Sequence, residues 1–170
     1  MIVTILRHGE AGNAASDHLR ELTAKGIEDV GKGCRRWLQQ CRHKNIEPPL
    51  RILHSPWLRT TQTATICADQ LAHSELVRES ALRSECRPYD VEIVLEREAQ
   101  LLAPCGHILL VSHQPLVSHL LSHYLGEVPN VPYMTPGDFV CLSLNVPATH
   151  CGELLFSLSA PVYEIQRPRV

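Results

Sequence analysis

Four side chains in this sequence are of the types that phosphoryl transfer requires: two arginines and two histidines. Arg7 and His8 end the apolar run in TILRHGE, and Arg59 and His113 lie in SPWLRTTQTA and VSHQP. Two guanidinium groups can hold the oxygens of a phosphoryl group through paired hydrogen bonds. A neutral imidazole can attack phosphorus and carry the group covalently, while a second, protonated imidazole can stabilise its charge. Gly9 would let backbone amides approach the same group. The residue types therefore indicate covalent phosphoryl transfer with His8 as the nucleophile.

These side chains can act together only if the segments that carry them lie side by side. Three short apolar runs, 2–6, 51–55 and 107–112, are typical of strands that are buried on both faces. Each run is followed, after a connection, by apolar residues at helical spacing, which predicts a parallel sheet with helices on both faces. Ligands bind beyond the carboxyl ends of such strands. Because all four side chains follow a strand end, we expect them at one edge of the sheet.

The remaining pattern completes the fold. Thr23 is a plausible N-cap for the first helix, and Pro115 and Gly126 mark the start and end of the last one. The other elements that we expect are helices near 58–71 and 90–102, a weaker strand at 76–79, and strands within 138–146 and 152–159. The predicted fold class is α/β: a three-layer sandwich with a mostly parallel central sheet, helices on both faces and a C-terminal antiparallel hairpin. We expect a single domain over residues 1–170.

Composition narrows the class of protein. The chain is 44% apolar, and its 16 basic and 18 acidic side chains nearly balance, which gives no reason to expect nucleic-acid or membrane partners. Seven scattered cysteines without a C-x-x-C pair argue against a disulfide framework or a zinc ribbon. No stretch has the length of a signal peptide or of a membrane span. We therefore expect a cytoplasmic protein with reduced thiols.

The motifs LRHGE, SPWLRTTQTA and VSHQP, in this order, resemble the signatures of the histidine phosphatase superfamily. The short length and the stretch ASDHLRELTAKG resemble its SixA-type phosphohistidine phosphatases in particular, and the resemblance covers roughly residues 2–126. It implies that His8 is the phosphorylated nucleophile, that Arg7 and Arg59 bind phosphate, and that His113 stabilises the transferring group. It also implies a further phosphate contact at Arg20. No metal or other cofactor is expected, since cationic side chains can offset a phosphate charge of about −2.

The proton donor is the point at which the sequence departs from the superfamily. Larger members place an acidic residue after the third strand, and here Glu79, Glu85 and Asp90 follow that position without a spacing that selects one. Glu85 is the nominal general acid. An imidazole departs more readily than an alkoxide, so a phosphohistidine substrate does not require a strong acid.

The distance between the third and fourth predicted strands bears on the substrate. Only 27 residues, 80–106, lie there, whereas superfamily members that act on small molecules often carry an inserted helical lid at this point. We expect an open site that suits a phosphorylated side chain on another protein, such as a histidine phosphotransfer domain. The predicted function is a metal-independent protein phosphohistidine phosphatase in phosphorelay signalling. Two alternatives stay open: a small-molecule phosphomonoesterase, and a catalytically silent module that binds phosphorylated partners.

Other residues with chemical potential have plainer interpretations. His119 and His123 have a spacing that can bind metal, but no acidic residue completes an H-E-x-x-H motif. We expect Trp57 to pack a helix or to form the rim of the site, and Ser55 to turn the chain.

Overall fold

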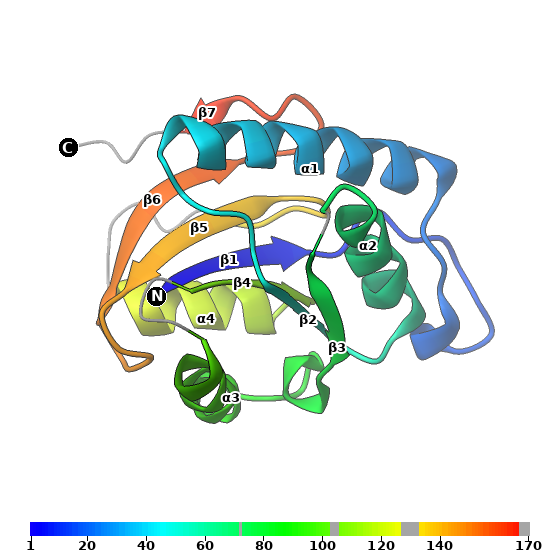
Figure 1. Ribbon diagram of the computed structural model, residues 1–170. Coiled ribbons are helices and arrows are strands. Elements are labelled where there is room, and N and C mark those ends of the chain that lie inside the picture. Colours follow the sequence, from blue (N-terminus) through cyan, green and yellow to red (C-terminus); the bar gives the residue numbers. More distant parts are fainter. Residues whose placement is uncertain (72, 103–105, 127–132, 167–170) are drawn as a thin grey trace.

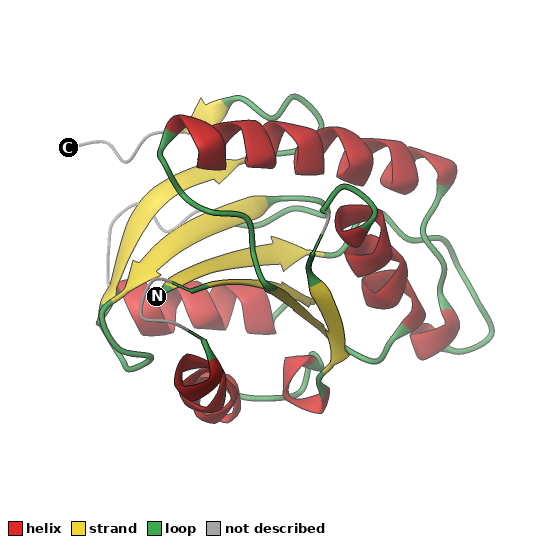
Figure 2. Cartoon of the chain, viewed as in Figure 1, coloured by secondary structure: helices red, strands yellow, loops and turns green. Residues whose placement is uncertain are grey.

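A mixed β-sheet runs through the middle of the protein, and helices cover both of its faces (Figures 1 and 2). The structure is a computed structural model that describes residues 1–71, 73–102, 106–126 and 133–166. The strands in these residues are β1 Ile2–Arg7, β2 Arg51–His54, β3 Glu75–Arg78, β4 His107–Ser112, β5 Phe139–Leu144, β6 Gly152–Leu158 and β7 Ile165–Gln166. The α-helices are α1 Ala24–His43, α2 Leu58–Ala68, α3 Pro88–Leu101 and α4 Leu116–Leu125, and the 3-10 helices are η1 Asp17–Leu19 and η2 Ser80–Leu82.

The sheet changes from parallel to antiparallel at β1. Its strand order is β3-β2-β4-β1-β5-β6-β7. The first four strands are mutually parallel, whereas β5 runs antiparallel to β1 and forms an antiparallel hairpin with β6. This arrangement confirms the predicted α/β class and the C-terminal hairpin. The first strand of the chain therefore lies between a parallel and an antiparallel neighbour.

The helices form the outer two layers, each over its own hydrophobic core. Buried side chains of α1 and α2 pack on one face of the sheet, and those of α3 and α4 pack on the other. Strand side chains alternate between the two cores: Val3 and Ile5 of β1 point to the α3/α4 side, and Leu6 points to the α1/α2 side. Burial on both faces explains why these strands are apolar runs rather than alternating sequences.

Local sequence fixes the ends of the helices. The Oγ1 atom of Thr23 accepts a hydrogen bond from the backbone N–H of Gly26 at 2.9 Å, so Thr23 caps α1 as predicted. Pro115 is the residue before α4 rather than its first residue. Gly126 ends α4 with a φ of +74°, a value that glycine adopts without strain.

The structure also differs from the sequence-based prediction in detail. Helix α3 begins at Pro88, two residues before the predicted start, because proline suits the first turn of a helix. The short strand β7 was not predicted. The predicted end of α3 at Leu102 lies one residue beyond its observed end at Leu101. None of the helices in the described ranges combines the length and the apolar character that crossing a bilayer requires.

Candidate active site

The residues that follow β1, β2 and β4 meet at one edge of the sheet, as the strand-end rule predicts. Arg7, the last residue of β1, pairs with Ser112, the last residue of β4. Past these strand ends, the N–H of His8 donates to the carbonyl of Ser112 at 3.0 Å, and the N–H of Ser55 donates to the carbonyl of Val111 at 3.1 Å. The backbone therefore fixes the relative positions of the three segments before any side-chain contact is considered.

His8 is a buried and neutral imidazole with its unprotonated nitrogen directed at a cation. Its Nδ1 lies 2.7 Å from the carbonyl oxygen of Gly9, so Nδ1 carries the proton and donates it. The other nitrogen, Nε2, accepts a hydrogen bond of 3.1 Å from Nε of Arg59. Burial, followed by the positive charges of Arg59, Arg7 and Arg20, lowers the pKa of His8 from 6.5 to about 3, against the opposing effect of the Gly9 hydrogen bond. Nε2 is therefore unprotonated throughout the neutral pH range, and its lone pair faces Arg59.

His113 lies beside His8, at 5.1 Å between ring centroids. Its Nε2 is 2.8 Å from Oγ of Ser55, and its ring is 4.5 Å from that of Trp57. Burial, followed by the proximity of His8 and Arg59, lowers the pKa of His113 to about 2. His113 is therefore a neutral imidazole, because burial and then the surrounding cations disfavour a positive charge on its ring. That it becomes protonated beside a transferring phosphoryl group stays a prediction. An anion between the two rings would raise this pKa again.

Arg59 and Arg7 supply fixed positive charge around the Nε2 atom of His8. Arg59 lies in the first turn of α2, is 4% exposed, and stacks over the ring of Trp57 at 4.6 Å. Arg7 donates through one terminal nitrogen to the carbonyl of Met134 at 2.8 Å, while its Nε is buried without a hydrogen-bond partner. A buried donor without a partner costs on the order of 1–3 kcal/mol, so an oxyanion that accepted from this atom would be stabilised.

Asp17 is a residue of this site that the sequence reasoning missed. It lies in η1, and its carboxylate accepts from a terminal nitrogen of Arg59 and from one of Arg20, both at 3.1 Å. Arg20 also donates to the carbonyls of Gly12 and Ala11 at 2.6 and 3.2 Å. Arg20 therefore reaches Arg59 through Asp17, and its hydrogen bonds go to this carboxylate and to the backbone rather than to His8. The i, i+3 spacing of Asp17 and Arg20 was the available signal.

The loop before β5 supports the backbone of His8 from the opposite side of β1. The backbone N–H of Gly137 donates to the carbonyls of both Arg7 and His8 at 3.1 Å, and the N–H of Arg7 donates to the carbonyl of Asp138. Gly137 has a φ of +88°, in the region that favours glycine. The backbone of His8 is thus held by β4 on one side and by this loop on the other.

The acidic residues considered as proton donors have other partners. Glu85 pairs with Arg83 at 3.2 Å, and Glu79 pairs with Arg97 at 3.0 Å. Asp90 caps the start of α3 by accepting from a backbone N–H at 2.8 Å. In the described part of the chain, none of the three forms a hydrogen bond or an ion pair with the two arginines and two histidines of the site. The structure therefore does not bring Glu85 to His8.

Metal binding has no support in the described ranges. His123 contacts Glu92 at 2.7 Å, whereas His119 is exposed on α4. Within residues 1–71, 73–102, 106–126 and 133–166, no group of three or more His, Cys, Asp or Glu side chains could hold a metal ion.

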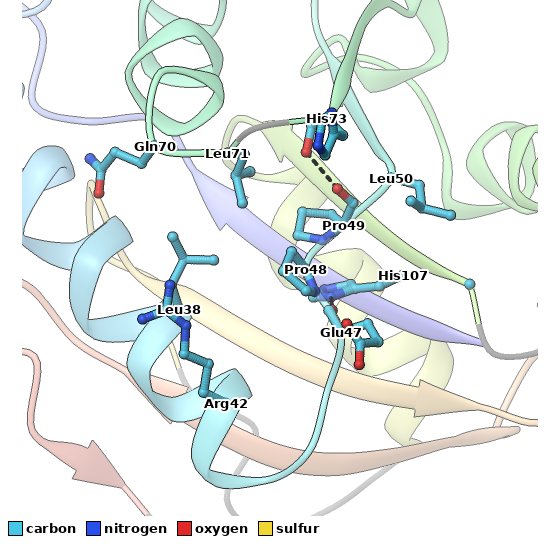
Figure 3. Close-up of a pocket in the computed structure, with 12 residues that line it drawn as sticks. Leu38, Arg42, Glu47, Pro48, Pro49, Leu50, Gln70, Leu71, His73 and His107 are labelled. Atoms are coloured by element: carbon cyan, nitrogen blue, oxygen red, sulfur yellow. Dashed lines mark hydrogen bonds between the residues drawn. The ribbon is translucent and has the colours of Figure 1, made fainter.

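A cavity of about 580 Å³ lies away from this site, near the amino ends of β2 and β4 (Figure 3). Its lining includes Leu38 of α1, Leu71 after α2, Leu50 just before β2, and His107 at the start of β4. His107 is buried and fully hydrogen-bonded, with Nδ1 at 2.7 Å from the carbonyl of Glu47. The cavity contains none of the four candidate catalytic residues, and its size alone therefore does not mark the site of the chemistry.

Comparison with known proteins agrees with the resemblance seen in the motifs. Neither the protein-family models nor the curated proteins gave a match. Among solved structures, the protein histidine phosphatase SixA complexed with tungstate is similar at 28% identity and a TM-score of 0.79, over 94% of this chain and 97% of that one. A protein named as a phosphohistidine phosphatase SixA from Agrobacterium tumefaciens gives 21% identity and a TM-score of 0.74, over 94% and 97% of the two chains. A protein named as an alpha-ribazole-5'-P phosphatase from Escherichia coli K-12 gives 17% and 0.65, over 91% and 94%.

Proposed function

We propose that this chain, whose fold and motifs are those of the histidine phosphatase superfamily, removes phosphate from phosphohistidine on a partner protein. One observation carries the proposal. The Nε2 atom of His8 is unprotonated and accepts from Nε of Arg59 at 3.1 Å, while Nδ1 is fixed by the carbonyl of Gly9. A neutral nucleophile with one nitrogen oriented and the other beside a guanidinium group suits attack on a phosphoryl group.

The reaction divides into two transfers. In the first, Nε2 of His8 forms a bond to phosphorus as the N–P bond of the substrate breaks. A substrate imidazole that is protonated on its other nitrogen leaves as a neutral ring, so no strong acid is needed at this step. In the second, water attacks phosphorus, the bond to His8 breaks, and the protons of the water leave with the phosphate. Arg7 and Arg59 hold the phosphoryl oxygens in both steps, with Arg20 as a more distant positive charge.

His113 assists as a neutral group that gains a proton only when the anion is present. Its Nδ1 is buried without a hydrogen-bond partner, and its Nε2 is held by Ser55. A transferring phosphoryl group near the ring would favour the protonated form and would in turn be stabilised by it. We assign Glu85 no role as the general acid.

The preference for a protein substrate is part of the same proposal. Between β3 and β4 the described chain consists of η2 and α3, and the buried Val91 and Leu95 of α3 pack in the core rather than over the strand ends. We propose a single domain over 1–170 without a lid, and a site that is open to a histidine phosphotransfer domain. The solved SixA protein with tungstate, named as a protein histidine phosphatase, supports this substrate class. The six cysteines in the described residues are free thiols, which suits a phosphorelay in the cytoplasm.

A labelling experiment tests the proposal. The protein is incubated with a 32P-phosphohistidine protein and, separately, with a chromogenic phosphomonoester. We expect phosphate release and an acid-labile, base-stable label on the wild type, and neither on His8→Ala. His119→Ala, which alters an exposed histidine of α4, serves as the matched control and should behave as the wild type does. EDTA should leave the rate unchanged.

Two outcomes would contradict this assignment. Full phosphate release by His8→Ala would remove the covalent step. A higher kcat/KM for the phosphomonoester than for the phosphohistidine protein would point to a small-molecule phosphatase instead.

A further inference from the structure

Asp17 occupies the positions on Arg59 that an oxyanion would take. Each of the three nitrogen positions of the Arg59 guanidinium has an acceptor. Its Nε donates to His8 at 3.1 Å, and its two terminal nitrogens donate to the backbone carbonyl and the carboxylate of Asp17, at 2.6 and 3.1 Å. These bonds use three of the five N–H donors of the guanidinium. A phosphoryl group that binds the same donors must therefore displace at least part of this set.

The carboxylate of Asp17 is also held by a second cation that faces the same space. Its other oxygen accepts from Arg20 at 3.1 Å. Burial alone would raise the pKa of Asp17, but the hydrogen bonds from Arg20 and Arg59 lower it overall. The group is therefore a carboxylate at neutral pH, with one oxygen on each of two arginines, as two oxygens of a phosphoryl group would be.

The surroundings allow this carboxylate to withdraw. The side chain of Asp17 is 54% exposed, whereas that of Arg59 is 5% exposed. The 3-10 helix that carries Asp17 is three residues long and has no buried residue. Displacement of Asp17 thus moves a surface group and leaves Arg59 and His8 in place.

We propose that Asp17 is a specificity-determining residue, which competes as an internal anion with phosphoryl groups for Arg59 and Arg20. The inference rests on the proposed function, because it concerns which phosphorylated molecules that site accepts. A small anion such as inorganic phosphate makes few contacts of its own that could offset the loss of the contacts between Asp17 and the two arginines. A phosphorylated protein makes further contacts across its interface, so its binding is weakened by a smaller fraction. Asp17 therefore lowers retention of the product and selects against small phosphate esters.

The test is oxyanion binding to the full chain, which requires no turnover. Isothermal titration with tungstate and with inorganic phosphate compares the wild type with Asp17→Asn and with the conservative Asp17→Glu. Asp69→Asn is the matched control, because it removes the same charge from the far end of α2, on the order of 15 Å from Arg59 along the helix axis. We expect Asp17→Asn to bind tungstate about three- to tenfold more tightly. Asp17→Glu and Asp69→Asn should stay near the wild-type value.

Two further measurements separate competition from a structural role. The gain in Asp17→Asn should shrink as KCl rises from 50 to 500 mM, because salt screens an exposed charge. A second neutral variant, Asp17→Ser, must shift binding in the same direction, and thermal melts of all variants establish that they fold. The ratio of kcat/KM for p-nitrophenyl phosphate to that for a phosphohistidine protein should rise in Asp17→Asn.

The outcomes also distinguish this inference from the proposed function. Unchanged or weaker tungstate binding by Asp17→Asn, with phosphohistidine hydrolysis intact, would overturn the role of Asp17 alone, because Asp17 would then position Arg59 or do nothing. If Asp17→Asn binds tungstate more tightly but the wild type does not hydrolyse phosphohistidine, the competition by Asp17 would stand and the proposed function would be rejected.

Discussion

Acid should destabilise this protein well above the pH at which its carboxylates are protonated. Burial lowers the pKa of His8 to about 3, of His107 to about 4 and of His113 to about 2. Below pH 6.5 the unfolded chain binds protons at these positions and the folded chain does not, so stability is lost as pH falls from 6.5 towards the folded-state pKa values.

The size of the effect follows from these shifts. Between pH 7 and pH 5 each of the three histidines lowers the free energy of unfolding by about 2 kcal/mol, and the three together by about 6 kcal/mol. The total free energy of unfolding of a domain of this kind is roughly 5–15 kcal/mol. We therefore expect the urea midpoint to fall steeply between pH 7 and pH 5, or the fold to be lost.

Urea unfolding at half-unit pH intervals measures the slope of the free energy of unfolding against pH. At pH 5.5 the substitution of any one of the three histidines by Asn should reduce the slope by about 1.2 kcal/mol per pH unit. Tungstate should flatten the pH dependence that arises from His8 and His113, since a bound anion raises their pKa values, but not that of His107, which lies away from the site. A constant free energy of unfolding from pH 7 to pH 5, or slopes that no histidine substitution changes, would refute the burial argument.

Three further substitutions test the geometry. Arg59→Lys keeps the charge but loses the planar fork, so single-turnover phosphate release should slow about 100-fold; a rate within twofold of wild type would show that charge alone suffices. Ser55→Ala removes the hydroxyl 2.8 Å from Nε2 of His113, so urea titration should show a loss of about 1–2 kcal/mol, and an unchanged midpoint would contradict a fixed ring. Gly26→Ala places a methyl group against the backbone of the turn after β1, so the free energy of unfolding should fall by about 1–3 kcal/mol. Gly31→Ala in the same helix has its nearest contact at 3.7 Å, so the free energy of unfolding should rise by up to about 1 kcal/mol. Equal melting temperatures for the two glycine variants would argue against that close approach.

The parallel half of the sheet could be predicted because its strands have a distinctive sequence pattern. Runs such as 107–112 are apolar throughout, which only burial on both faces explains, and the order of strand and helix then brings their carboxyl ends together. That rule placed Arg7, His8, Arg59 and His113 at one edge, where the structure has them. The chemical roles of these residues remain predictions.

The parts that could not be predicted depend on contacts between distant segments. A hairpin pattern does not say which strand it joins, so the position of β5 beside β1 and the loop contact from Gly137 were not foreseeable. The protonation state of His113 depends on burial and on neighbouring cations, which residue type does not reveal. Asp17 lies in a short turn without hydrophobic periodicity, and its pairing with Arg59 spans 42 positions. Sequence pattern reports local structure better than it reports such pairings.

The position of β1 has a consequence for how the protein is made. This strand is synthesised well before its neighbours β4 and β5, which comprise residues 107–112 and 139–144. Until those residues have been made, β1 has two unpaired edges, which nascent chains must keep from joining other strands. The loop that holds the backbone of His8 directly precedes β5, so His8 gains this support only after Gly137 has been synthesised. A nascent chain that ends before this loop therefore contains His8 without the contact that fixes its backbone from the second side.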